Sequence, residues 1–178
     1  MSFRMINVML TCFCLIVSLD VANVAQGDMC KKRLRIGVVL PLSAGPVSSG
    51  EAVRKSIELA HEKYDKNGCV QFVFEDDQLQ PKNTVTAVNK LIEIDRVNAL
   101  VVYGTPTSLA VNETAEKAKV PMLALSILDR VVAGKQYVMK HWCTAERLNE
   151  AVVKESQQRG YKKVAIVSTV NDAMLKLR

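Results

Sequence analysis

Short runs of consecutive apolar residues alternate along this chain with longer stretches in which apolar residues recur every three or four positions. An apolar run without polar alternation is typical of a strand buried on both faces, and the longer spacing is typical of an amphipathic helix. Strands are predicted at 34–42, 70–75, 99–103, directly after Pro121, and at 163–169. Helices are predicted at 50–66, from Pro81 onward, between 109 and 119, and at 144–159. This order predicts an α/β fold with a parallel sheet and right-handed crossovers.

Hydroxyl residues stand where three of these helices are predicted to begin. Their side-chain oxygens can accept hydrogen bonds from the free N–H groups of a first helical turn. The candidate caps are Ser48 and Ser49, Thr107 or Ser108, and Thr144.

The segment 129–141 interrupts the regular pattern because it holds Gly134 and shows no clear period. It is predicted to be a crossing segment that leads into another α/β unit. The helix 144–159, with Val152 and Val153 facing inward, and the strand 163–169 would begin that unit.

The turn between the strand 99–103 and the following helix is the predicted centre of function. Free backbone N–H groups at a helix start, together with hydroxyl side chains, make a site for a carboxylate or another small anion. In open α/β sheets, ligands bind beyond the carboxyl ends of the strands. Residues 105–108 and 126–128 each follow such a strand, so both segments are expected at one ligand-binding edge.

The composition of the 178 residues, 49% hydrophobic and 24% charged, is that of an ordinary globular protein. The net charge of +6 raises the question of a nucleic-acid partner. Lys and Arg are, however, spread among acidic residues on the predicted helices, and the aromatic residues are not interleaved with them. This distribution indicates a solvated basic surface and argues against nucleic-acid binding.

The first 27 residues are predicted to be a signal peptide and not part of the fold. Arg4 supplies the positive end, 5–19 is an apolar region of signal-peptide length, and Ala25-Gln26-Gly27 has the small-x-small form of a cleavage site. A membrane anchor is the alternative, but a run of about fifteen apolar residues is short for a spanning helix. Export to the periplasm, or another extracytoplasmic location, is therefore expected.

Three of the five cysteines lie beyond this segment, namely Cys30, Cys69 and Cys143. Export makes a disulfide possible, but three is an odd number, so at least one is free or pairs outside the chain. The sequence has no Cys-x-x-Cys, and its two histidines lie far apart, so no metal site is expected. It also lacks a nucleophile elbow and a phosphate-binding glycine-rich loop, so neither an enzyme nor a cofactor is expected.

Five segments resemble, in the right order, segments of type I periplasmic binding proteins of the branched-chain amino-acid-binding group. They are Ile36-Gly37-Val38-Val39-Leu40-Pro41-Leu42-Ser43, Glu75-Asp76-Asp77-Gln78 before Pro81, Val102-Tyr103-Gly104 followed by Thr107-Ser108, Ala115-Glu116-Lys117-Ala118 before Val120-Pro121, and Gly160 to Val167. The resemblance implies two α/β lobes that close on a small ligand, such as an amino acid, which is then passed to the membrane permease of an ABC transporter. A sensory or regulatory domain of the same fold is the alternative.

The resemblance also implies a division of the chain and a set of ligand residues. Residues 28–138 would form the first ligand-binding lobe, and 139–178 the start of a second lobe that is incomplete here. In the amino-acid binders, the turn that matches Thr107 and Ser108 holds the ligand carboxylate, and the strand end that matches Ser126 accepts from its ammonium group. Ile127 and Ser49 are further candidates. Two departures are Leu128, where the family often has a hydroxyl residue, and the lack of an aromatic residue near Ser49.

Each of these residues also has a purely structural interpretation. Thr107 and Ser108 could only cap a helix, and Ser126 could be a hydroxyl satisfied at a strand end. The adjacent carboxylates of Asp76 and Asp77 could suggest metal or acid–base chemistry, but a structural role at the end of a strand is favoured. Trp142 could line the ligand cleft or simply pack.

Overall fold

The computed structural model describes Cys30 and residues 33–165. The chain divides into two units after Arg33, and the fold described here is that of the second unit. The predicted signal peptide 1–27 lies outside the described residues. The predicted strand 163–169 lies mostly outside them as well, and its first three residues are not in a strand.

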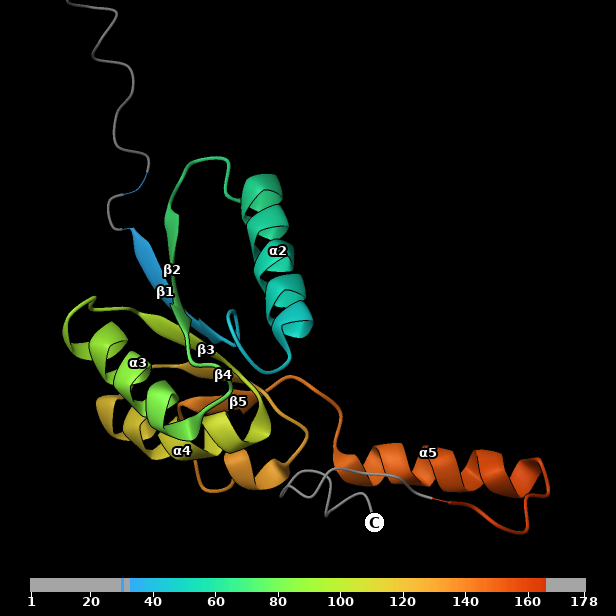
Figure 1. Cartoon of the computed structure of the whole chain (residues 1–178). Helices are drawn as coiled ribbons and strands as arrows, with labels where there is room; N and C mark the ends of the chain where they lie inside the picture. The colour runs from blue at the N-terminus through green and yellow to red at the C-terminus, as the bar shows by residue number, and fades with distance from the viewer. Residues whose placement is uncertain (1–29, 31–32, 166–178) are drawn as a thin grey trace, which may run out of the picture. The chain divides into compact units, whose positions relative to one another are not determined.

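The described residues form five strands, four α-helices and one 3-10 helix, shown in Figure 1. In chain order these are β1 (Leu34–Leu40), α2 (Val47–Tyr64), β2 (Val70–Asp76), α3 (Pro81–Glu93), β3 (Ala99–Tyr103), α4 (Thr105–Ala118), β4 (Met122–Leu125), η2 (Asp129–Val131), β5 (Val138–Lys140) and α5 (Ala145–Gln158). The predicted α/β fold with a parallel sheet is confirmed.

All five strands pair in parallel in the order β2-β1-β3-β4-β5. After β1 the chain forms β2 on one side of it. It then crosses back to form β3 on the other side of β1, and β4 and β5 are added in turn beyond β3. Because parallel crossovers are right-handed, the reversal puts α2 on one face of the sheet and α3 and α4 on the other. Figure 1 shows α2 separated from α3 and α4 in this way.

The hydrophobic core lies between the sheet and the two helices α3 and α4. Every second strand residue points to this face, including Val39, Val102 and Ala124, which are fully buried. They pack with Leu91 of α3 and Val111 of α4, which are also fully buried. Gly37 makes room for this packing, because a Cβ there would lie 2.9 Å from the Leu91 side chain.

The opposite face is covered less completely. The helix α2 lies over it, and of its residues only Gly50 is buried. On the β3, β4 and β5 side of this face, Val101 and Leu123 are half-buried, and Met139 is 54% exposed. The described residues therefore leave an apolar strip on one half of a parallel sheet, a kind of sheet that is normally covered on both faces.

The segment 129–141 does not leave the sheet, so the prediction of a crossing segment is wrong. It holds η2 and then β5, whose Val138 pairs with Met122 of β4. The Glu116 carboxylate of α4 holds the start of β5 by accepting hydrogen bonds from the backbone N–H groups of Gln136 and Tyr137. The sheet thus runs past the predicted lobe boundary at 138/139, and the division into lobes itself stays a prediction.

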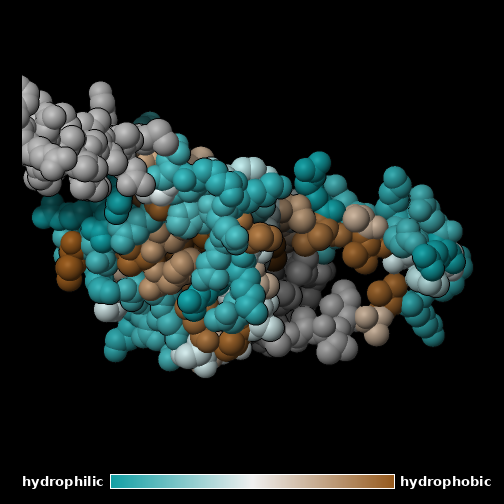
Figure 2. Space-filling view, turned by 90° about the horizontal axis from the view of Figure 1, so that it is seen from above, coloured by the Kyte–Doolittle hydropathy of each residue, from teal (hydrophilic) through white to brown (hydrophobic). Residues whose placement is uncertain are grey.

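The helix α5 begins as predicted but is not packed as predicted. Thr144 is its N-cap, with the side-chain oxygen accepting from Arg147 N at 3.2 Å. Val152 and Val153 were expected to face inward, and they are 60% and 54% exposed. Figure 2 shows hydrophobic side chains among hydrophilic ones at the end of the molecule where α5 lies.

The structure also shows the state of three cysteines, and whether any described helix could span a membrane. Cys30 and Cys69 are disulfide-bonded, and Cys143 is free and exposed. Among the described residues, none of the helices is both long enough and apolar enough to span a bilayer.

Candidate ligand-binding site

Because all five strands are parallel, their carboxyl ends lie at one edge of the sheet. Strands β3 and β4 end there at Tyr103 and Leu125, and the two predicted ligand segments follow directly. This edge is where ligands bind in open α/β sheets.

The first turn of α4 forms the floor of the candidate site. Gly104 precedes the helix with a φ of 96°, and its N–H donates to Leu125 O at 3.1 Å. Its carbonyl accepts from Ser108 N at 3.1 Å, which closes the first turn. The N–H groups of Thr105 and Thr107 stand in the first turn of α4, where no preceding helical carbonyl accepts from them, whereas Pro106 has no N–H. Thr105 is 5% exposed and Thr107 is fully buried.

Thr105 and Ser126 join the two segments through their hydroxyl groups. Their oxygens lie 2.9 Å apart, and Ser126 Oγ also accepts from Leu128 N at 3.2 Å. Ser126 is fully buried, and Thr105 is 5% exposed. Ser126 thus lies at the predicted edge and is paired there with Thr105, and its contact with a ligand stays a prediction. Thr105 was predicted to lie in this edge segment but not to be a ligand residue, although its place directly after Gly104 is a sequence signal for the start of the helix.

Thr107 and Ser108 lie in the same turn, but their hydroxyls face the protein. Both residues are fully buried. Thr107 Oγ1 donates to the carbonyls of Tyr103 and Gly104, and Ser108 Oγ lies 3.5 Å from Val102 O. Neither caps α4, which begins at Thr105 without a side-chain cap, so the capping prediction is wrong. Their contact with a ligand stays a prediction, and their observed role is to hold the turn.

Ser49 and Ile127 lie at the same edge, and both are half-buried. Ser49 is in the first turn of α2, which begins at Val47, so neither it nor Ser48 is the predicted cap. The Ile127 carbonyl accepts from Ala145 N at 3.1 Å, which fixes the start of α5. No hydrogen bond among the described residues joins Ser49 to the Thr105–Ser126 pair.

The two carboxylates at the end of β2 hold neighbouring loops, as the structural interpretation predicts. Asp76 accepts from Leu42 N at 2.8 Å and from Ser43 Oγ. Burial opposes ionisation of Asp76, but these hydrogen bonds prevail and lower its pKa below the usual 3.8. Asp77 is fully buried and accepts from Thr84 Oγ1 at 2.7 Å. Burial raises the pKa of Asp77, and the charge of Asp76 adds to the rise.

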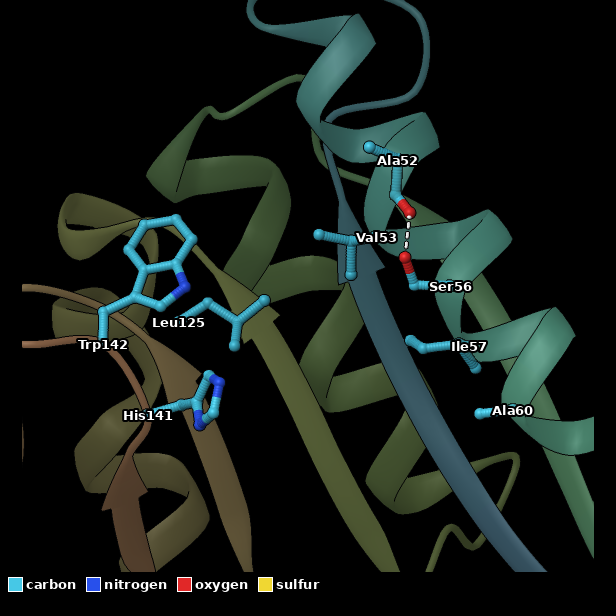
Figure 3. Close-up of a pocket in the computed structure, with 8 residues that line it drawn as sticks. All are labelled: Ala52, Val53, Ser56, Ile57, Ala60, Leu125, His141 and Trp142. Carbon is cyan, nitrogen blue, oxygen red and sulfur yellow. Dashed lines mark hydrogen bonds between the residues drawn. The ribbon is translucent and has the colours of Figure 1, made fainter. Parts of the chain in front are cut away.

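An apolar groove lies between α2 and the ends of β4 and β5 (Figure 3), and Leu125, which lines it, directly precedes Ser126 of the floor. Its volume is about 400 Å³, and Val53 and Ile57 of α2 face Leu125, His141 and Trp142 across it. Trp142 packs edge-on against the Tyr103 ring at a centroid distance of 5.4 Å. The indole packs on Tyr103, as the packing interpretation predicts, and it also lines this groove, while its contact with a ligand stays a prediction.

The arrangement suits binding through neutral hydrogen-bond donors. The start of α4 and the Thr105–Ser126 pair lie at the edge of the sheet where β4 ends, and Leu125 at that end lines an apolar groove. Such a combination can hold a polar or anionic head and an apolar body. The described residues contain no cluster of three or more histidine, cysteine or acidic side chains that could hold a metal ion.

A family model described as "Periplasmic binding protein" matches residues 33–175. No curated protein matches the chain. Among solved structures, the leucine-binding protein LivK from Thermotoga maritima is similar at 26% identity and a TM-score of 0.67, over 71% of this chain and 38% of its own. A Rhodopseudomonas palustris solute-binding protein of an ABC transporter, in complex with 4-hydroxybenzoate, is similar at 24% identity and a TM-score of 0.70.

That second match covers 82% of this chain and 42% of the solved one. The Streptococcus pneumoniae branched-chain amino acid transporter substrate-binding protein LivJ, in complex with isoleucine, is similar at 20% identity and a TM-score of 0.60, over 64% of this chain and 35% of its own. This chain therefore spans less than half the length of the solved proteins it matches.

Proposed function

This chain belongs to the periplasmic binding protein family, and we propose that it binds a small carboxylate-bearing solute at the carboxyl edge of its sheet. The observation that carries the proposal is the junction of Thr105 and Ser126, 2.9 Å apart, at the start of α4. A carboxylate there would accept from the free N–H groups of the first turn and would face the positive end of the helix dipole.

The similar structures support the choice of a carboxylate. One is a leucine-binding protein, another holds isoleucine, and a third holds 4-hydroxybenzoate. These ligands differ in shape but share a carboxylate and an apolar body. In this chain the polar floor lies beside an apolar groove lined by Leu125 and Trp142, which matches that combination.

We propose further that the protein works outside the cytoplasm, together with the permease of an ABC transporter. Relatives named as parts of ABC transporters support this role. The disulfide-bonded state of Cys30 and Cys69 supports an oxidising compartment. N-terminal sequencing of the secreted chain is expected to begin at Asp28, and a mature chain that kept Met1 would contradict export by a cleaved signal.

Ligand binding can be tested by titrating the isotope-labelled chain and following its backbone amides by NMR. L-leucine or 4-hydroxybenzoate is expected to shift the amides of Thr105, Thr107 and Leu128. The matched controls are L-leucinol and 4-hydroxybenzyl alcohol, which keep the apolar body and lack the carboxylate. Equal shifts with the controls would contradict carboxylate recognition, and shifts confined to another part of the fold would contradict the site.

A further inference from the structure

The turn between β2 and α3 has an uncommon backbone. Gln78 and Leu79 both have a φ of 56°, in the left-handed region that residues other than glycine rarely adopt. Two consecutive residues in this conformation need strong support from their surroundings, and such positions cluster where a protein must hold a particular geometry.

The support comes from the paired carboxylates at the end of β2. Asp76 Oδ1 accepts from Gln78 N at 3.0 Å, and Asp77 Oδ1 accepts from Leu79 N at 2.9 Å. Asp77 itself is fully buried, and its other oxygen accepts from Thr84 Oγ1 of α3. The left-handed pair is thus tied to the strand before it and to the helix after it.

The result of this backbone is the placement of the half-buried Leu79 side chain against Gly104. A Cβ at Gly104 would lie 2.7 Å from Leu79 Cδ1, so the leucine occupies the space that any larger residue at 104 would need. On its other side, a Cβ at Gly45 would lie 3.6 Å from Leu79 Cβ and 3.4 Å from Gln78 O. Leu79 therefore lies near both Gly45, in the loop between β1 and α2, and Gly104, the N-cap of α4.

We propose that Leu79 is a positioning residue for the ligand site, holding Gly104 and with it the first turn of α4 in the geometry that binds ligand. The proposal rests on the proposed function for the identity of the site. Gly104 donates to Leu125 O and accepts from Ser108 N, so a shift of Gly104 would disturb both segments of the floor. No ligand contact by Leu79 is required.

The test compares amide hydrogen exchange in Leu79→Ala, Leu79→Met and the wild-type chain. Leu59→Ala is the matched control, because Leu59 is 66% exposed on α2. In Leu79→Ala the amides of Gly104 and Ser108 are expected to exchange about tenfold faster, while those of Val111 and Ala115, deeper in α4, keep their wild-type rates. Leu79→Met, which refills the space, is expected to restore slow exchange, and the control is expected to change nothing.

Unchanged exchange at Gly104 and Ser108 in Leu79→Ala would overturn the inference. So would an equal rise across the whole of α4, because that pattern indicates general loss of stability and not a local role. A parallel NMR titration with L-leucine separates this inference from the proposed function. If the wild-type chain shows no shifts at the site, the proposed function fails, while the exchange rates still decide the role of Leu79.

Discussion

At the scale of single residues, the hydroxyl groups of the candidate site are turned toward the protein rather than toward solvent. Thr107 and Ser108 donate to backbone carbonyls, and Thr105 pairs with Ser126. Sequence spacing could show that hydroxyl residues gather at this edge, but it could not show which way each side chain turns. That choice depends on where α4 begins, and with Gly104 as its N-cap the helix begins three residues earlier than it would with Thr107 as the cap.

Ser126→Ala is expected to lower the free energy of unfolding by about 1–3 kcal/mol, because it leaves Leu128 N–H and the Thr105 hydroxyl without a partner in a buried place. Urea denaturation of the purified chain measures this change. Ser48→Ala, at an exposed position in α2, is the control and is expected to stay within about 0.5 kcal/mol of wild type. A Ser126→Ala chain as stable as the control would show that the pair contributes nothing to the floor.

Asp77 is expected to make stability fall as pH rises. Burial raises its pKa, so between 3.8 and the folded-state pKa the folded protein binds a proton that the unfolded chain has released. Stability from this group is therefore complete below 3.8 and is lost as pH rises through the folded pKa. Asp77→Asn has no carboxyl group to titrate, so it does not lose this stability. The melting temperature of Asp77→Asn minus that of wild type should therefore increase as pH rises from 3.8 through the folded-state pKa.

Asp76→Asn is the control of opposite sign. The lowered pKa of Asp76 contributes stability above 3.8 that is lost as pH falls through the folded pKa. Asp76→Asn should therefore lower the melting temperature at neutral pH and leave the melting temperature in strong acid unchanged. If the melting temperatures of Asp77→Asn and wild type change with pH in parallel, the raised pKa of Asp77 is contradicted.

At the scale of elements, the sequence pattern was sufficient to predict a strand or helix wherever local signals and tertiary packing agree. The strand β3 was predicted at its observed bounds because an uninterrupted apolar run ends at Gly104. Pro81 begins α3 as predicted, since its missing N–H is harmless in a first turn. The three-residue strand β5 was missed because it is too short for periodicity to appear. Its start is held by backbone N–H groups that donate to the Glu116 carboxylate, a contact that no local pattern shows.

The helix α5 shows where pattern alone misleads. Its spacing predicts a buried apolar face, but burial depends on a partner surface, and Ala145 is its one buried residue in the described structure. An isolated helix of this length is marginally stable in water. We expect amide protection in α5 to be at least about a hundredfold lower than in β3, as measured by hydrogen exchange. Equal protection would show that α5 is packed in solution.

At the scale of the whole molecule, affinity depends on how much of the ligand is enclosed. Small-ligand sites typically bury about 70–90% of the ligand surface. The described residues enclose the candidate site with one floor and one groove, and the chain covers 38% of the leucine-binding protein it resembles. We therefore expect the 178-residue chain to bind L-leucine more weakly than about 1 mM, which is about −4 kcal/mol. Micromolar binding in a calorimetric titration would contradict this.

The half-covered sheet has a consequence for the life of the protein in a cell. Quality-control factors recognise unfolded chains by exposed apolar surface, and the residues that the structure describes leave such surface partly uncovered at Val101, Leu123 and Met139. While the strip stays uncovered, chaperones and proteases would treat a correctly folded molecule as an unfinished one. Its abundance would then be set by how fast the strip is covered, as well as by the free energy of its fold.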